Sequence, residues 1–209
     1  MKFERITLGQ SIMRYEVPLD IFTTINSIYE TKFLQLPAAN KALAGKIKNE
    51  HTIFHDGNDK LQKKNSFIPQ NVFEWFISIF KHYLIYNNYQ NSNLHLNSIW
   101  INEMKDNEYN PIHRHYGSLE TGLSSVMILK LPTHFGNEYS AEHLPMNGKL
   151  QIIGSTSGQF AKMEYTPPMF LRDFYVFPYD MRHCVYPFND TNQVRRTLAA
   201  NCDVMLEKI

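Results

Sequence analysis

Two histidines, His113 and His115, lie one residue apart in residues 110–132 (NPIHRHYGSLETGLSSVMILKLP). Side chains alternate along an extended chain, so both imidazoles would point to the same face. Two imidazoles on one face can hold one metal ion. A loop rich in turn-forming residues follows, and then an apolar run typical of a β-strand. We therefore expect a metal-binding face on β-structure, completed by ligands from further along the chain.

A third histidine, His183, lies in residues 173–187 (DFYVFPYDMRHCVYP). This segment predicts a strand, a tight turn at 179–180 and a returning strand that carries His183. The returning strand could bring His183 to the same place as the first two histidines.

Residues 194–203 (VRRTLAANCD) predict a strand with an arginine on each face. A guanidinium binds a carboxylate through two N–H groups, and a nearby hydroxyl adds one more bond. The face with Arg195 also carries Thr197 and further small or polar residues, which leaves room for a ligand. We therefore expect Arg195 to point inward as an anion anchor and Arg196 to point toward solvent or covering helices.

The chain of 209 residues predicts a single domain, 1–209, with a mainly helical part over 1–93 and a β-rich core over 94–209. Its net charge of +1 favours neither nucleic acid nor an anionic membrane as a partner. Two cysteines without a CxxC pattern, and no apolar leader or membrane-spanning run, indicate a reducing, cytoplasmic compartment. The oligomeric state stays open.

Helical periodicity dominates the first part and strand alternation the second. After an extended entry over residues 1–17, we expect helices from Pro18, after Pro37 through Leu43 and Ile47, and over about 69–86, with loop over 51–66. Strands are predicted from residue 94 and around 111–115, 122–131, 149–154, 159–165, 173–178, 181–186 and 194–204. This pattern predicts an α+β fold, an antiparallel sandwich or barrel with helices on one face.

The order of these residues resembles the Fe(II)/2-oxoglutarate-dependent dioxygenase superfamily, whose fold is a double-stranded β-helix, the cupin-like jelly roll. More narrowly, NEYNPIHRHYG, LSSVMILKLP, YVFPYDMRHCVYPF and RRTLAAN are similar to a family of such oxygenases from marine bacteria and their phages. The resemblance covers about residues 95–204, while the N-terminal helices match only in general layout.

The resemblance implies an oxygenase that uses Fe(II) and 2-oxoglutarate to hydroxylate a small-molecule or peptidyl substrate. It assigns His113, His115 and His183 to the metal, and Arg195 with Thr197 to the distal carboxylate of 2-oxoglutarate; no further catalytic residue is implied. His115 stands where that superfamily usually has a carboxylate, so the metal, Fe(II) or Zn(II), would keep more positive charge. If all three bind one ion, their nitrogens should lie within about 3–4 Å of each other; otherwise His115 hydrogen-bonds beside the metal.

Two other interpretations stay open. One is a cupin-like three-histidine metal-binding protein or dioxygenase that works without 2-oxoglutarate, although the Arg195-x-Thr197 spacing favours a cosubstrate. The other is a degenerate jelly roll that serves as a binding or structural protein.

The remaining histidines show no ligand pattern. We expect His51 and His55 to be a solvated pair, and the others to lie at the surface or the edge of the core: His82, His95, His134 and His143. Residues 133–147 form a long segment between core strands and are a candidate substrate loop.

Overall fold

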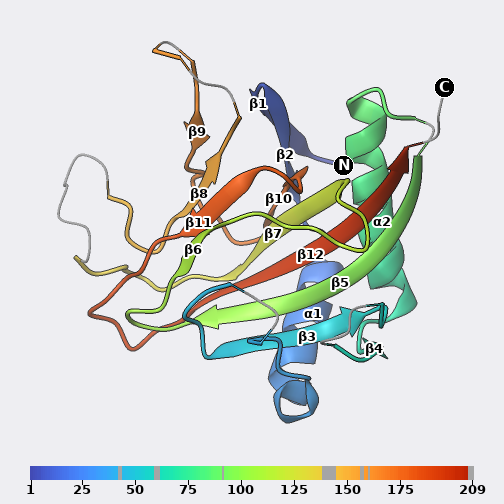
Figure 1. The fold of residues 1–209 in the computed structure, drawn as a ribbon. Coiled ribbons are helices and arrows are strands. Elements are labelled where there is room, and N and C mark those ends of the chain that lie inside the picture. The colour runs from blue at the N-terminus through green and yellow to red at the C-terminus, as the bar shows by residue number, and fades with distance from the viewer. Residues whose placement is uncertain are drawn as a thin grey trace.

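The computed structural model describes residues 1–41, 44–58, 62–90, 92–137, 145–155, 158–159 and 161–206. Its strands form two sheets (Figure 1). The first half of the chain contains β1 (Phe3–Leu8), β2 (Gln10–Glu16), α1 (Leu19–Lys32), the 3-10 helix η1 (Phe33–Gln35), β3 (Asn49–His55), β4 (Asn65–Ser66), α2 (Gln70–Tyr86) and β5 (Ser92–Met104). The second half contains β6 (Asn110–His113), β7 (Gly122–Lys130), β8 (Leu150–Ile153), β9 (Glu164–Tyr165), β10 (Asp173–Pro178), β11 (Arg182–Val185) and β12 (Arg195–Leu206).

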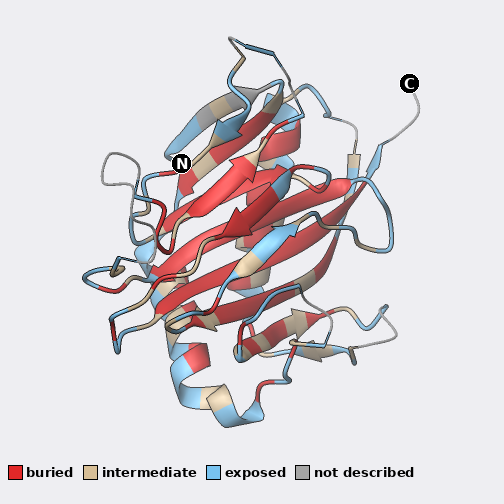
Figure 2. Cartoon of the chain, turned by 60° about the vertical axis from the view of Figure 1, so that its left-hand side comes forward, coloured by how far each residue is buried: buried red, intermediate tan, exposed pale blue. Residues whose placement is uncertain are grey.

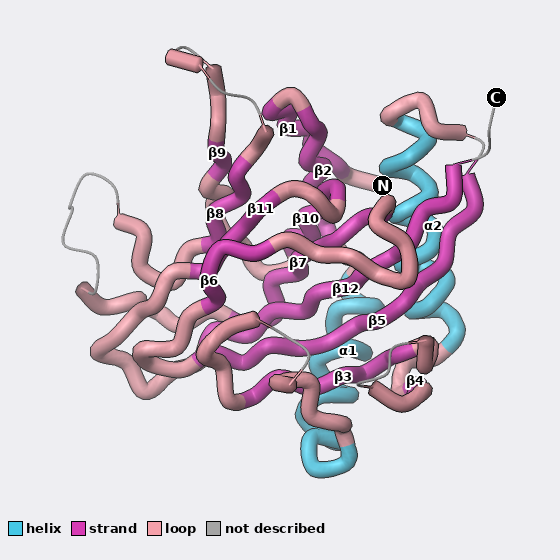
Figure 3. The backbone as a smooth tube through the Cα atoms, in the orientation of Figure 1, coloured by secondary structure: helices cyan, strands magenta, loops and turns pink. Residues whose placement is uncertain are grey.

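The large sheet has eight strands in the order β1-β2-β10-β7-β12-β5-β3-β4, and the small sheet has four in the order β6-β11-β8-β9. All pairings between named strands are antiparallel. The long strand β12 pairs with β5 on one side and β7 on the other, so it runs through the middle of the large sheet (Figure 3). This two-sheet arrangement is a double-stranded β-helix, as the sequence resemblance implied.

The two helices pack on one face of the large sheet (Figure 1). In α2 the buried residues Val72, Phe76 and Phe80 recur at helical spacing, and Phe76 packs edge-on against Phe174 of β10. Pro69 precedes the first turn, where its missing N–H costs no hydrogen bond. The outward-facing residues of β12, such as Leu198 and Ala200, lie in this same apolar layer.

A second apolar cluster lies between the two sheets. It joins Ile128 and Tyr175 of the large sheet to Leu150 and Ile152 of the small sheet. Figure 2 shows the buried strands running continuously through the middle of the molecule. The space between the sheets is the cup in which the predicted ligands gather.

Most strands predicted from residue 94 onward, and the helices near 18 and 70, are confirmed. Of the predicted strand 159–165, only residues 164–165 form one (β9), and residue 160 lies outside the described residues. Two predictions for the N-terminal part are wrong. The described residues of segment 38–48 form no helix (Leu43 lies outside them), and β3 covers residues 49–55, although loop was expected from residue 51. The extended entry is a hairpin, β1–β2, that joins the large sheet beside β10. These segments are strands because a neighbouring strand pairs with them, which local periodicity does not record.

Candidate metal centre and anion pocket

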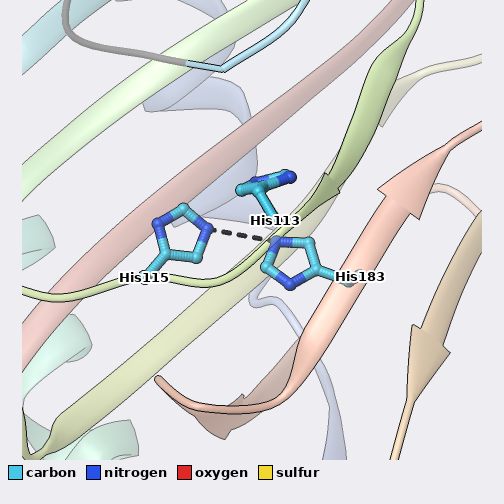
Figure 4. A group of neighbouring side chains, drawn as sticks. All are labelled: His113, His115 and His183. Atoms are coloured by element: carbon cyan, nitrogen blue, oxygen red, sulfur yellow. Dashed lines mark hydrogen bonds between the residues drawn. The ribbon is translucent and has the colours of Figure 1, made fainter.

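His113 and His183 lie opposite each other on paired strands. His113 ends β6, His183 lies on β11, and the two are direct partners in the antiparallel register. His115 follows two residues after His113, beyond the end of the strand, where its backbone N–H donates to the carbonyl of Tyr179 at 3.0 Å. All three imidazoles therefore turn toward one point (Figure 4).

The ligand atoms of the three histidines all lie within 4.8 Å of one another. The Nε2 atoms of His115 and His183 are 3.1 Å apart, and the ring centroids of His113 and His183 are 4.3 Å apart. The predicted convergence is thus present, with an overall spread somewhat larger than the expected 3–4 Å. Within the described part of the chain, no carboxylate joins the three imidazoles.

Backbone carbonyls fix the orientation of two of the rings. The Nδ1–H of His113 donates to the carbonyl of Pro111 at 2.7 Å, and that of His183 donates to the carbonyl of Met181 at 3.1 Å. A neutral imidazole whose Nδ1 carries the proton has its lone pair on Nε2. Hydrogen bonds of this kind also orient metal-binding histidines in other proteins.

Burial keeps the three imidazoles neutral. It lowers the pKa of His183 to about 3, with a further contribution from the nearby His113. The pKa of His115 is well below its ordinary value, and that of His113 is also lowered, in both cases chiefly by burial. Neutral imidazoles have the free lone pairs that metal binding needs, so this donor set fits a divalent transition metal.

Arg195 and Arg196 point to opposite sides of the large sheet, as predicted. Arg195 is 0% exposed and lies in the cup, against the sulfur atoms of Met104 (3.7 Å) and Met169 (3.8 Å). Arg196 faces the helices, where it pairs with Glu103 at 2.8 Å and with Glu30 of α1 at 3.2 Å.

The guanidinium of Arg195 has no carboxylate partner among the described residues. One terminal nitrogen lies 3.4 Å from the Thr197 hydroxyl, and its buried Nε has no hydrogen-bond partner. Burial lowers the pKa of Arg195 to about 10, so the side chain stays charged at neutral pH. The arrangement leaves a buried positive charge without a counter-ion among the described residues.

A cavity of about 520 Å³ lies beside the histidines. One wall consists of cup-facing residues of β3 and β5, including Glu50, His55 and Trp100. The Trp100 ring centroid lies 5.7 Å from that of His115. Sequence reasoning missed the β3 part of this wall because residues 51–66 were predicted to be loop; the β-branched and aromatic run Thr52-Ile53-Phe54 was the available signal.

The other histidines divide into buried and exposed groups. The prediction of a solvated pair is wrong: His55 is buried in β3, and His51 is half-buried against the rings of Tyr29 and Phe33. Both belong to a strand with a neighbour on each side, which removes them from water. The predicted positions of three others at the surface or the core edge are confirmed (His82, His95 and His134), while His143 and residues 138–144 of the candidate substrate loop lie outside the described residues.

The sequence model of a family described as "Putative 2OG-Fe(II) oxygenase" matches residues 98–201. The match covers all three histidines, Arg195 and Thr197. The matched region is thus similar to the 2OG-Fe(II) oxygenases, which are oxidoreductases. A search of curated proteins gives no match.

Solved structures agree in fold. A prolyl-4-hydroxylase from Pseudomonas putida superposes with a TM-score of 0.58 at 12% identity, covering 93% of this chain and 92% of that one. The non-heme alpha ketoglutarate dependent epimerase SnoN from nogalamycin biosynthesis gives 0.56 at 11% identity (93% and 78% covered). A prolyl hydroxylase from Trichoplax adhaerens, in complex with a hypoxia inducible factor peptide fragment, gives 0.54 at 9% identity (92% and 83% covered). At such identities the likeness shows the fold alone.

No helix in the described part of the chain is long and apolar enough to cross a membrane.

Proposed function

We propose that the protein is an Fe(II)- and 2-oxoglutarate-dependent oxygenase that hydroxylates a C–H bond of a substrate bound in the cavity. His113, His115 and His183 hold the metal through their Nε2 atoms. When bound there with 2-oxoglutarate, Fe(II) supplies oxygen activation, with one oxygen atom going to the substrate and the other to succinate as carbon dioxide leaves. The chain contributes ligand geometry, a water-poor cup and the placement of the substrate.

The observation that carries the proposal is the unpaired buried charge of Arg195. Burying a guanidinium without a counter-ion is unfavourable, and the distal carboxylate of 2-oxoglutarate would provide the missing partner. Thr197, 3.4 Å away, can donate to the same carboxylate. Met104 and Met169 cover the guanidinium, and methionine side chains can move aside easily because they are unbranched.

One observation favours a second candidate. Three imidazoles without a carboxylate suit a cupin-like dioxygenase that binds its substrate directly on the metal and uses no 2-oxoglutarate. That enzyme would bind metal in the same place, but it would have no use for a carboxylate grip at Arg195.

Anaerobic reconstitution with Fe(II) separates these functions. We expect one iron per chain, metal-dependent binding of 2-oxoglutarate, and slow succinate formation when oxygen is admitted without substrate. His183→Ala should lose the metal, whereas His95→Ala, on the exposed surface, should keep it. Iron binding without 2-oxoglutarate binding would favour the second candidate, and a protein that takes up no stoichiometric metal would be a degenerate binding protein.

A further inference from the structure

The cavity beside the histidines contains a carboxyl group that the proposed metal chemistry does not use. Glu50 lies on the cup face of β3, opposite Asn102 of β5, and its side chain lines the cavity. It is 1% exposed, although carboxylates are seldom fully buried unless they are paired. Glu50 is not among the groups that converge on the metal centre.

The protein leaves Glu50 poorly satisfied. Its Oε1 atom is buried and has no hydrogen-bond partner. Its Oε2 atom lies 3.4 Å from the amide nitrogen of Asn40, which makes a shorter bond of 2.6 Å to the carbonyl of Ile47. No Lys, Arg or His of the described chain forms an ion pair with Glu50.

The neighbouring carboxylates do have partners. Asp56, also in the cavity wall, accepts hydrogen bonds from His95 at 2.6 Å and from the backbone of Asn58 at 2.9 Å. Glu108 accepts from the backbone N–H groups of two lysines. Burial, together with the charge of Glu108, raises the pKa of Glu50 to about 7. A positively charged group in the cavity would give Glu50 both a hydrogen-bond donor for its unpaired oxygen and a counter-ion for its carboxylate.

We propose that Glu50 binds a primary ammonium group of the substrate, which makes the substrate class an aliphatic amine, either a free small molecule or a lysine side chain. This inference rests on the proposed function, because it takes the cavity as the substrate site. Trp100 lines the same cavity near His115, so its ring can pack along the methylene chain between the ammonium group and the metal centre. The C–H bond to be hydroxylated would lie on that chain.

Two matched pairs of compounds test the inference by calorimetry on the iron-loaded protein without oxygen. The first pair is N-acetyl-L-lysinamide and N-acetyl-L-norleucinamide, and the second is 5-amino-1-pentanol and 1,5-pentanediol. We expect the ammonium compound of one pair to bind about tenfold tighter than its neutral partner, a ratio equivalent to ~1.4 kcal/mol. The pair that shows this preference identifies the source, a lysine side chain or a free amine.

Variants assign the preference to Glu50. Glu50→Gln should abolish it, and Glu50→Asp, which keeps the charge on a shorter side chain, should retain part of it. Glu103→Gln is the matched control, because Glu103 lies on the opposite face of the same sheet and pairs with Arg196. It should leave the preference intact.

Three results would overturn the inference: equal affinity for both members of each pair, no binding of any compound, or a preference that survives in Glu50→Gln. A 2-oxoglutarate titration of the same samples shows whether such a result rejects only the role of Glu50 or also the proposed oxygenase function. Retained 2-oxoglutarate binding without ammonium preference rejects only the role of Glu50, while loss of 2-oxoglutarate binding in the wild type rejects the proposed oxygenase.

Discussion

Asn201 contacts the one histidine of the centre that has no carbonyl partner for Nδ1. Its amide nitrogen lies 3.3 Å from His115 Nδ1, and its oxygen accepts from the Ser124 hydroxyl at 2.9 Å. In this arrangement His115 carries its proton on Nε2, which donates to Nε2 of His183. Metal binding through Nε2 requires the proton on Nδ1, so the Asn201 amide would then turn its oxygen toward His115. If the three histidines bind one metal as proposed, His115, which stands where the resemblance places a carboxylate, is also the residue whose tautomer would change.

Arg195 and Arg196 provide the sharpest residue-scale prediction. Replacing Arg195 by Leu should weaken 2-oxoglutarate binding by about 2–5 kcal/mol, the range for removing one partner of a buried charge pair. Replacing Arg196 by Leu should cost much less binding, since Arg196 contacts Glu103 and Glu30 on the helix side.

Calorimetric titration of 2-oxoglutarate into both iron-loaded variants measures the difference. An Arg196 variant that loses binding while the Arg195 variant keeps it would refute the assignment of the anchor.

At the scale of elements, the carboxylate of Asp203 helps to hold the loop after His115 against β12. Asp203 accepts from the backbone N–H of Leu119 at 3.1 Å, from the Asn97 amide at 2.9 Å and from the Tyr179 hydroxyl at 3.2 Å. Gly117 lies within this loop, so close to the Asp203 carboxylate that a Cβ atom would overlap it. The close approach explains why a glycine stands two residues after His115.

Gly117→Ala should therefore push the loop away from β12 and displace His115. We expect the affinity for Fe(II) to fall by at least about tenfold, equivalent to ~1.4 kcal/mol, while 2-oxoglutarate contacts at Arg195 remain possible. Ser118→Ala, an exposed position in the same loop, is the control and should bind iron normally. Metal titration of both variants checks the prediction, which fails if the alanine at 117 leaves iron affinity unchanged.

At the scale of the whole molecule, the buried centre makes the stability of the metal-free fold depend on pH. The pKa of His183 is about 3 in the folded state, against an ordinary value of 6.5. Well above pH 6.5 the residue is neutral in both states and has no effect on stability. As the pH falls from about 6.5 toward 3, the unfolded chain binds a proton that the folded chain does not, so folding stability is lost.

From His183 alone the expected loss on going from about pH 7.5 to pH 5 is about 2 kcal/mol. Urea unfolding of the metal-free protein at both values measures it. Other groups also titrate in this range, so the informative quantity is the difference between the wild type and His183→Gln, which carries no titrating group at this position. The variant should lose about 2 kcal/mol less, and an identical pH dependence in the two proteins would contradict the prediction.

The sequence by itself determined the β-rich half of the molecule. Alternating apolar residues from 92 to 206 encode strands buried on one or both faces, and their turns are marked by local residues such as Tyr179-Asp180. The polarity of the two faces of β12 was enough to orient Arg195 inward and Arg196 outward. The spacing of His113 and His115 indicated a shared face, and the resemblance assigned His183, on a predicted returning strand, to the same centre.

Only the tertiary structure decided the wall of the cavity. The segment of β3 is short and rich in polar residues, and it becomes a strand because β5 offers it a pairing edge. That pairing places Glu50 opposite Asn102, a neighbour 52 positions further along the chain whose proximity no local pattern encodes. The N-terminal hairpin likewise gains its place by pairing with β10. Local periodicity shows which face of an element is apolar. The partner of a strand depends on long-range pairing, and that pairing decides which polar groups meet in a cavity.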